Sequence, residues 1–442
     1  MNDDPALGSS IDFDPSDSGG GADSSEERLM GVLSQPAAES RGLTRVFKGF
    51  HYRDFRLMWL GACTSSIGTW MQNLAQAWLV YDISGSAFYL GLDAFLAQLP
   101  IMLFSLFGGV FADRTSRRKI LLISQYIQMT NAFVLAILMY SGLRHVWPIL
   151  ALSFVTGTAQ SFGGPAYSAL VPTLVEPEDL PNAIALNSIQ FNLARIIGPV
   201  LGGIALKTLG ATWCFGLNGV SFVAVIVSLY MIRVRFDPKP NAESVMASMK
   251  SGFAFIRERE AMVSLIFLAF SITALAFPMI AFLPVFARSV FNSGSNAYSA
   301  LLASSGLGSV TGALIIAAMS RRKDLGKPAL SMLAILGVTT TCFALSKIVV
   351  LSCFFLFLSG AAMMSVFALL ISMVQLITPD DMRGRVMSVY NVAFRGGMPV
   401  GSIFIGAIIQ RHSAPPVIAV NGVLLILLAS YFLFINRRIA GL

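Results

Sequence analysis

The stretch "GGVFADRTSRRKILL", residues 108–122, joins two long apolar runs through one acid and four bases. All five charged residues lie between Asp113 and Lys119. Short clusters of Lys and Arg between apolar runs are typical of the cytoplasmic loops of membrane proteins. The bases therefore indicate a cytoplasmic turn between two membrane-spanning helices, whereas the acid has no role in that topology and needs a separate explanation.

The composition of the whole chain also indicates a membrane protein. Of its 442 residues, 55% are hydrophobic and 12% are charged, whereas a soluble domain usually carries about 25% charged residues. The net charge of +8 is spread over short clusters between apolar runs, so we expect no nucleic acid partner. The four cysteines and three histidines have no metal-binding spacing, and we expect neither a metal nor a cofactor.

Apolar runs of the length of a membrane span recur along the chain. A helix needs about 20 apolar residues to cross the hydrocarbon core of a bilayer. Only helices and closed barrels satisfy their backbone groups in lipid, so these runs predict an all-α membrane protein with twelve transmembrane helices. The runs are 57–80, 86–111, 120–140, 147–171, 184–206, 212–232, 261–286, 297–319, 329–346, 348–377, 386–409 and 415–435.

The distribution of Lys and Arg predicts the orientation of these helices. With the N-terminus inside, the cytoplasmic segments hold 22 bases and the external loops hold five. The positive-inside rule therefore places both termini in the cytoplasm. The loop with Glu176, Glu178 and Asp179 has no base, but acids contribute little to that rule.

The two halves of the chain repeat each other. "LVEPEDLPNAIALNSIQFNLARIIGPVLGG" (174–203) resembles "LITPDDMRGRVMSVYNVAFRGGMPVGSIFIG" (376–406), and Arg195 and Pro199 match Arg395 and Pro399 at an offset of 200. A parallel repeat of two six-helix bundles is a transporter architecture. We expect a disordered acidic cytoplasmic tail at 1–44, an N-terminal bundle at 45–235, a cytoplasmic linker with an amphipathic helix at 236–260, and a C-terminal bundle at 261–442.

Two motifs resemble those of the major facilitator superfamily. One matches its G-x-x-x-D-R-x-G-R-R signature, except for Ser116 at the second glycine, through Gly109, Asp113, Arg114, Arg117 and Arg118. The other, "GPVLGG" (198–203), resembles the G-P-x-x-G-G motif of its proton-driven exporters. With "SIGTWMQNLAQAWLVYD" (66–82) and "RGRVMSVYN" (383–391), these motifs are similar to the branch that contains the bacterial enterobactin exporter. The resemblance implies a secondary transporter of the bacterial cytoplasmic (inner) membrane, not an enzyme.

The resemblance also implies a role for the acid of the opening stretch. In the family, this aspartate contacts the N-terminal end of the eleventh helix when the transporter is open to the outside, where the helix dipole favours a carboxylate. The repeat predicts a mirror contact between the bases of 320–323 and the acids before the fifth helix. We therefore expect a cytoplasmic gate of Asp113, Arg114, Arg117, Arg118, Glu178, Asp179, Arg321, Arg322, Asp381, Arg383 and Arg385.

Three ionisable groups lie inside the predicted helices. Each is costly at membrane depth unless it is partnered or hydrated, so each is a candidate functional residue. Arg195 and Arg395 either bind an anionic substrate in a central cavity or tie helices together through carbonyls and amides. Asp93 either carries the coupling proton or is a packing acid hydrogen-bonded to a neighbour.

Polar and small residues mark two of the predicted helices. Gln72, Asn73 and Gln76 recur at helical spacing in the first one, and amides are expensive against lipid. We expect them to point into the bundle, either to the substrate cavity or to another helix. The fifth helix carries a predicted helix-packing motif in which the glycines permit close approach and the proline bends the helix: Gly198, Pro199, Gly202 and Gly203.

Together these features predict a proton-coupled antiporter that exports a small amphipathic or anionic metabolite, such as a siderophore, by alternating access. Multidrug or antibiotic efflux and lysophospholipid transport are alternatives within the class. A membrane scaffold or sensor without transport is an alternative from another class. The chain has no G-x-x-x-x-G-K-S/T loop, which argues against ATP as the energy source. The expected partners are the small-molecule substrate, protons and the lipid bilayer, and we expect a monomer.

Overall fold

The computed structural model describes residues 47–142, 144–233, 245–318 and 324–441, and within them residues 106, 109–114 and 245–248 by their backbone alone. The regular elements of these ranges are all helices. The tail predicted at 1–44, the first part of the predicted linker, and Arg321 and Arg322 of the predicted gate lie outside the described residues.

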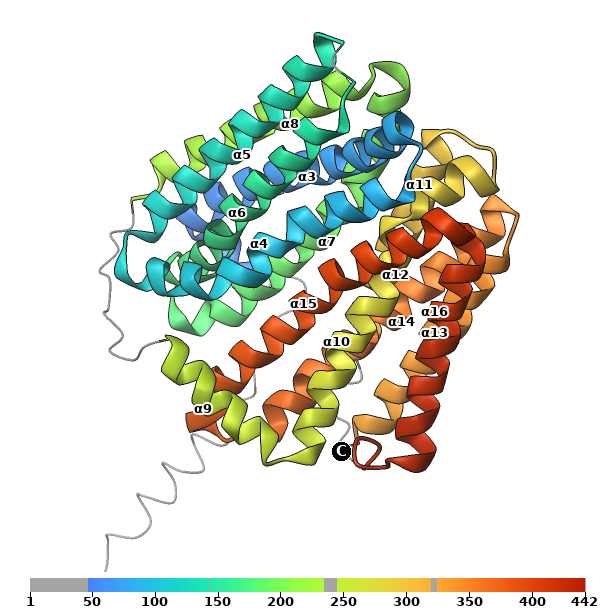
Figure 1. Cartoon of the computed structure of the whole chain (residues 1–442). Coiled ribbons are helices and arrows are strands. Elements are labelled where there is room, and N and C mark those ends of the chain that lie inside the picture. The colour runs from blue at the N-terminus through green and yellow to red at the C-terminus, as the bar shows by residue number, and fades with distance from the viewer. Residues whose placement is uncertain (1–46, 143, 234–244, 319–323, 442) are drawn as a thin grey trace, which may run out of the picture. The chain divides into compact units, whose positions relative to one another are not determined.

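The helices fall into two sets that pack mainly within themselves (Figure 1). The first set contains η1 (Lys48–His51), α3 (Arg53–Ser84), α4 (Ala87–Arg114), α5 (Arg117–Tyr140), α6 (Val146–Leu170), η2 (Val171–Thr173), η3 (Pro177–Asp179), α7 (Leu180–Thr208) and α8 (Ala211–Met231). The second set contains α10 (Glu260–Ala281), α11 (Leu283–Val285), η4 (Phe286–Val290), α12 (Ser295–Ala318), α13 (Gly326–Leu345), α14 (Val349–Leu376), α15 (Asp380–His412), α16 (Ala414–Ser430) and η5 (Tyr431–Ile435). Between them lies α9 (Val245–Arg257), which packs on α15 and α10.

The packing partners repeat between the sets, as the sequence repeat requires. In the first set α3 packs on α7, α4 on α6, and α5 on α8. In the second set α10 packs on α15, α12 on α14, and α13 on α16. The sets meet through α7 with α12 and through α4 with α15, which are again equivalent pairs.

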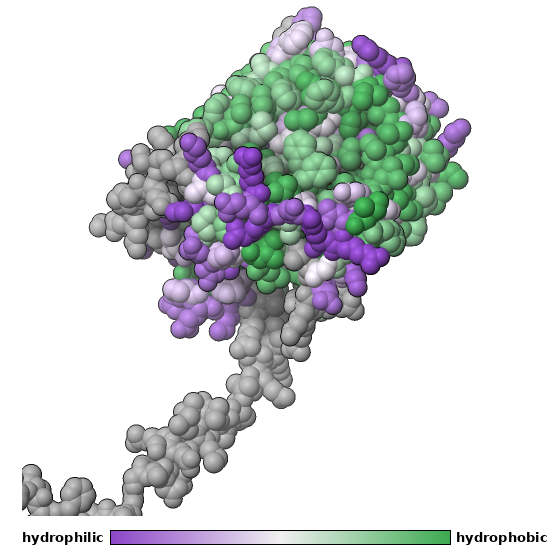
Figure 2. All heavy atoms as spheres, turned by 60° about the horizontal axis from the view of Figure 1, so that its bottom comes forward, coloured by the Kyte–Doolittle hydropathy of each residue, from purple (hydrophilic) through white to green (hydrophobic). Residues whose placement is uncertain are grey.

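Ten of the described helical segments are long and apolar enough to cross a membrane. The long helices α3 and α6 are not among them. Helix α3 begins with Arg53, Asp54 and Arg56 and carries three amides further along. Helix α6 has no Asp, Glu, Lys or Arg but is rich in Ser, Thr and Gly. Figure 2 shows hydrophilic side chains gathered at the end where α9 lies and hydrophobic side chains over the neighbouring flank.

The turn of the opening stretch is shorter than predicted. We expected Asp113 and Arg114 between two helices, but α4 continues through both, and only Thr115 and Ser116 separate it from α5. The carbonyl of Ser116 accepts the amide N–H groups of Lys119 and Ile120, at 2.9 Å and 3.1 Å, and so starts the new helix. The residues from Phe111 to Arg114 have no glycine or proline to end α4, so the helix extends past the apolar run.

Candidate functional site

Glycines set the distance between the two sets of helices. Where α7 crosses α12, a Cβ atom on Gly203 would lie 2.4 Å from the Cβ of Ser299. The Ser299 hydroxyl donates a hydrogen bond of 2.6 Å to the carbonyl of Pro199 at the same crossing. Where α4 crosses α15, a Cβ atom on Gly91 would lie 2.4 Å from the carbonyl oxygen of Ser402. Both crossings therefore depend on glycine, which lets helix backbones approach closely.

The predicted helix-packing motif has two contact faces. A Cβ atom on Gly198 would lie 2.4 Å from the Cβ of Trp70, and one on Gly202 would lie 3.1 Å from the Cα of Met71, so these glycines hold α7 against α3. Gly203 faces α12 of the other set. Helix α7 continues through Pro199 to Thr208. The motif thus serves the packing of one set and the contact between the sets.

A group of polar side chains joins the sets at the end where α3 passes into α4. We call this group the clasp. Arg288 donates to Asp82 in an ion pair, the hydroxyls of Tyr81 and Ser289 lie 2.8 Å apart, and Ser86 donates to Oε1 of Gln410 at 2.8 Å. Just inside the clasp, the ring of Trp78 stacks on that of Tyr298, with centroids 6.3 Å apart and planes 18° apart. Sequence reasoning missed the clasp.

Asp93 is buried, with 8% of its surface exposed, and it is hydrogen-bonded from two other helices. Gln76 of α3 donates to its two oxygens at 3.0 Å and 3.2 Å, and Ser153 of α6 donates to Oδ1 at 2.5 Å. The amide nitrogen of Gln76 also donates to the hydroxyl of Ser153 at 2.8 Å. A packing acid and a proton carrier are both compatible with these contacts, because each needs a partnered carboxylate.

The three amides of α3 lie in different surroundings. Gln72 is buried and accepts a hydrogen bond of 2.7 Å from Asn218, so it ties α3 to α8. Gln76 belongs to the Asp93 cluster, whereas Asn73 is exposed. Of the three, Gln76 is the one that the structure brings to an ionisable group.

Arg195 lies beside aromatic rings and close to the crossing of α7 and α12. Its guanidinium carbon is 5.8 Å from the centroid of Trp70, and Phe191 packs edge-on against the same ring at 6.2 Å. This spacing is within the range of a cation–π interaction. A Cβ atom on Gly306 of α12 would lie 3.2 Å from the Arg195 carbonyl.

Arg395 is the repeat-related arginine of the second set. Its side chain is exposed, and its neighbour Gly396 approaches α4, where a Cβ atom on this glycine would lie 3.1 Å from the sulfur of Met102. Aromatic rings accompany it along α15, α14 and α10: Tyr390 stacks on Phe394, Phe394 packs edge-on against Phe367, and Phe367 stacks on Phe277. Among the described contacts, Arg195 is thus the one of the two arginines whose guanidinium lies over a ring, whereas the rings near Arg395 in the sequence pack on one another. No sequence pattern indicated this aromatic row.

The two bases of the signature motif whose side chains are described bind helix ends. Arg117 donates to the carbonyl of Ala169 at the end of α6 at 2.9 Å, and Arg118 donates to the carbonyl of Tyr230 at the end of α8 at 3.0 Å. Cations are favoured there by the helix dipole and by carbonyls that lack helical partners. The side chains of Asp113 and Arg114 lie outside the described part of the chain.

Of the two predicted gate acids at the start of α7, Asp179 has partners within the first set. Asp179 accepts a hydrogen bond of 2.9 Å from Tyr52 and lies 3.8 Å from the Lys48 ammonium, while Glu178 is exposed. Desolvation and the hydrogen bond to Asp179 raise the pKa of Tyr52 above its usual value. The hydroxyl therefore remains a donor at neutral pH, and it joins the start of α3 to the start of α7.

The acids and bases at the start of α15 are mainly exposed. Arg383 pairs with Asp380 at 2.5 Å within the first turn, and Asp381 is exposed. Arg385 contacts the sulfur of Met382, and its carbonyl lies against Gly252 of α9, where a Cβ atom would come within 2.6 Å. The second turn of α15 thus packs against α9, while the first turn remains exposed.

The fold has two repeat-related sets of helices, close crossings at small residues, and a buried carboxylate and two arginines within helices of membrane length. These features are typical of a membrane transporter. Solved structures with this fold include a peptide transporter in complex with sulfate, with a TM-score of 0.71, 12% identity, and coverage of 87% of this chain and 94% of that one. The chain belongs to the transmembrane secretion effector family of the major facilitator superfamily, whose model matches residues 44–441. The resemblance predicted from the motifs is confirmed, and the protein is not an enzyme.

Relatives of known name come from several bacteria. The staphyloferrin A transporter of Staphylococcus aureus is 21% identical over 84% of this chain and 94% of its own length. Macrolide efflux protein A of Streptococcus pyogenes is 23% identical over 87% of this chain and 96% of its own length. The enterobactin exporter of Salmonella typhi is 27% identical over 46% of this chain and 49% of its own length.

Proposed function

We propose that the chain is a proton-coupled antiporter that exports a small amphipathic or anionic, siderophore-like metabolite from a bacterial cell. The clasp supports this proposal most directly. Alternating access requires two bodies that close at one end of the membrane while the substrate enters at the other, and the clasp joins two repeat-related bodies at one end of α3 and α4. Relatives named for staphyloferrin A and enterobactin support a siderophore-like substrate.

The proposed architecture has twelve membrane-spanning helices in two six-helix bundles in the inner membrane. Its support is that α3 packs on α7 and α8 and α6 packs on α4 and α5, all helices of the same set, and that Gln72 and Ser153 are buried in these contacts. With both termini in the cytoplasm, the clasp lies outside and the protein faces inward. We propose that it functions as a monomer.

The substrate is proposed to bind between the two arginines. Arg195 supplies a cation over the ring of Trp70, and the exposed Arg395 supplies a second cation on α15, the helix that also carries Phe394. An anionic group with an attached ring or apolar chain matches both features, because the guanidinium binds the anion and the rings bind the apolar part. Exposed Asn73 is a candidate hydrogen-bonding residue in the same passage, whereas Gln72 is proposed to hold α3 against α8.

Asp93 is proposed to carry the coupling proton. It is partnered by Gln76 and Ser153, which both donate to the ionised form. Protonation weakens the hydrogen bond from Gln76, which lies on α3 two residues before Trp78, and Trp78 stacks on Tyr298 of the other set. The electrical work of moving one charge through 100 mV is about 2.3 kcal/mol, so one such group can couple export to the proton gradient.

The cytoplasmic gate remains a proposal that rests on the signature motif. Asp113, at the end of α4, would contact the start of α15 when the outside opens, with Arg383 and Arg385 beside it. Arg114, Arg321 and Arg322 belong to the same proposed gate, as do Glu178, Asp179 and Asp381. Charge reversal by Asp113→Lys should then lower transport without lowering the amount of protein in the membrane, and unchanged transport would refute this role.

Flux in reconstituted vesicles tests the proposal. Purified protein in proteoliposomes with an imposed pH gradient should move a carboxylate or catecholate siderophore against its concentration, and dissipating the gradient should stop the movement. Asp93→Asn should leave the protein folded and abolish the dependence on the gradient. Absence of flux for every solute under every gradient would refute the transporter and favour a scaffold or sensor.

Macrolide or multidrug efflux is a second candidate, because Macrolide efflux protein A aligns over most of this chain. Deleting the protein would then raise sensitivity to macrolides without changing secreted siderophore. The same vesicles with a labelled lysophospholipid test the third substrate class.

A further inference from the structure

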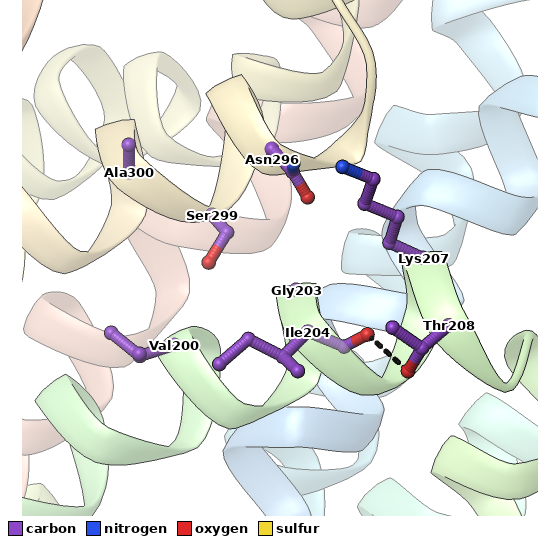
Figure 3. Close-up of a pocket in the computed structure, with 8 residues that line it drawn as sticks. All are labelled: Val200, Gly203, Ile204, Lys207, Thr208, Asn296, Ser299 and Ala300. Carbon is purple, nitrogen blue, oxygen red and sulfur yellow. Dashed lines mark hydrogen bonds between the residues drawn. The ribbon is translucent and has the colours of Figure 1, made fainter.

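A groove lies between α7 and α12 on the face where the two sets of helices meet. It has a volume of about 410 Å³ and is lined by Val200, Gly203, Ile204, Lys207, Thr208, Asn296, Ser299 and Ala300 (Figure 3). We propose that this groove binds an anionic membrane phospholipid, with the headgroup at Lys207 and one acyl chain along the apolar part. Binding is separate from transport, so it can be present in a protein that moves no substrate.

The groove has a polar end and an apolar end. Lys207 and Thr208 are the last two residues of α7, and Asn296 is the second residue of α12, so these polar groups lie at the ends of membrane-length helices. Val200 and Ile204 lie further into α7, and a separation of seven residues along a helix corresponds to about 10 Å. This order is that of a lipid, whose headgroup lies at the membrane surface and whose chains lie inside it.

The charge at the polar end selects an anion. Lys207 is exposed, and no ion pair is described for it within the part of the chain that the structure covers. Figure 3 shows its side chain extending from α7 toward Asn296, so a cation and an amide lie on opposite sides of the groove's polar end. Basic residues between transmembrane helices bind the headgroups of anionic lipids.

Exposure and charge favour a lipid over a second copy of the chain. Val200 and Ile204 are 42% and 57% exposed, so the groove opens on the flank of the helices rather than into their core. A symmetric dimer centred on this groove would place the Lys207 residues of two copies against each other, and like charges in an apolar surrounding repel. A phosphate group there meets a cation instead.

The floor of the groove belongs to both sets of helices. Gly203 of α7 and Ser299 of α12 form it, and Ser299 donates to the Pro199 carbonyl beneath. A lipid in the groove therefore contacts both sets at once. Such a ligand stabilises the arrangement in which α7 and α12 touch, because residues of both helices line its site.

Native mass spectrometry of the purified full chain, with phosphatidylglycerol or phosphatidylcholine added, tests the site. The wild type should retain phosphatidylglycerol preferentially. Lys207→Gln should weaken phosphatidylglycerol binding about five-fold, the effect of one basic residue near an anionic surface, and leave phosphatidylcholine binding unchanged. Lys347→Gln, at an exposed lysine between α13 and α14, is the matched control and should behave as the wild type.

Ala300→Trp separates the apolar part of the site from the charge. Ala300 is exposed and lines the groove, so a tryptophan can fill the chain-binding part without entering the core, and it should displace both lipids. The proposal would be overturned if Lys207→Gln and Lys347→Gln bound phosphatidylglycerol equally well. It would also be overturned if Ala300→Trp, at an unchanged melting temperature, bound both lipids as well as the wild type. A dimer, measured by light scattering, that Ala300→Trp dissociates would overturn it too, because such a dimer would assign the groove to a second copy.

Discussion

Replacing Gly203 by alanine tests whether α7 and α12 separate during transport. The added Cβ would lie 2.4 Å from both Cβ and Oγ of Ser299, whereas ordinary contact begins near 3.4 Å, so the helices must move apart by about 1 Å. The hydrogen bond from Ser299 to Pro199 would lengthen from 2.6 Å to about 3.6 Å and be lost. Gly203→Ala thus opposes the contact between the two bundles and leaves the interior of each bundle unchanged.

The magnitude follows from these two losses. Overpacking costs about 1–3 kcal/mol, and the hydrogen bond contributes about 0.5–1.5 kcal/mol. Both penalties apply only while α7 and α12 touch, so the equilibrium between closed and open clasp should shift by at least about 1.5 kcal/mol. That shift lowers the population of the closed form at least ten-fold relative to the open form.

Spin labels at Leu209→Cys and Asn296→Cys measure this equilibrium as a distance distribution. Gly203→Ala should move the distribution to longer distances. Gly164→Ala is the control, because a Cβ atom there has no neighbour within 4 Å among the described residues. Ser299→Gly in the Gly203→Ala background removes the obstructing Cβ but not the loss of the hydrogen bond, so it should move the distribution back toward the short distance in part, whereas Ser299→Ala should not. An unchanged distribution in Gly203→Ala would refute the reasoning.

Three further predictions concern other parts of the protein. Asp93→Asn should make transport in vesicles independent of the imposed pH gradient, and retention of the gradient dependence would show that another group carries the proton. Arg288→Gln removes an exposed ion pair worth about 0.2–1 kcal/mol, so the labelled distance distribution should shift by no more than about five-fold in population. Gly198→Ala places a Cβ atom 2.4 Å from that of Trp70 and should destabilise the folded protein by about 1–3 kcal/mol, which a lower melting temperature would show. Gly216→Ala is the control, because its Cβ atom has no described neighbour within 4 Å, and it should melt as the wild type.

The helices could be located from the sequence because burial in lipid requires long apolar runs. Their ends could not be located in the same way. Helix α15 begins at Asp380, six residues before the predicted run, and α4 extends to Arg114. Hydropathy marks the part of a helix that lies inside the hydrocarbon core, whereas polar turns of the same helix continue beyond it. Acids in such a turn, such as Asp380 and Asp381, also stabilise the helix because they lie at the positive end of its dipole.

The candidate site could be predicted in part. Asp93 was predicted as a candidate because an acid inside an apolar run is rare, but its partner Ser153 had no distinguishing signal among the serines of α6. The ion pair of the clasp joins residues 206 positions apart, and nothing local in the sequence relates Asp82 to Arg288. Sequence reasoning finds a group that is unusual for its surroundings, whereas pairing between distant ordinary residues emerges only from the fold.

The position of Asp93 relates the proposed proton site to the clasp. Gln76, which donates to Asp93, lies two residues before Trp78 on α3, and Trp78 stacks on Tyr298 of the other set. Loss of the charge of Asp93 would weaken the hydrogen bonds that it accepts from Gln76 on α3 and from Ser153 on α6. Helix α3 carries the first of these partners and also the ring that meets the other set, so a change at Asp93 reaches the contact between the bundles through one helix. A proton carrier deeper in one bundle would need a longer chain of intermediate residues to reach the clasp.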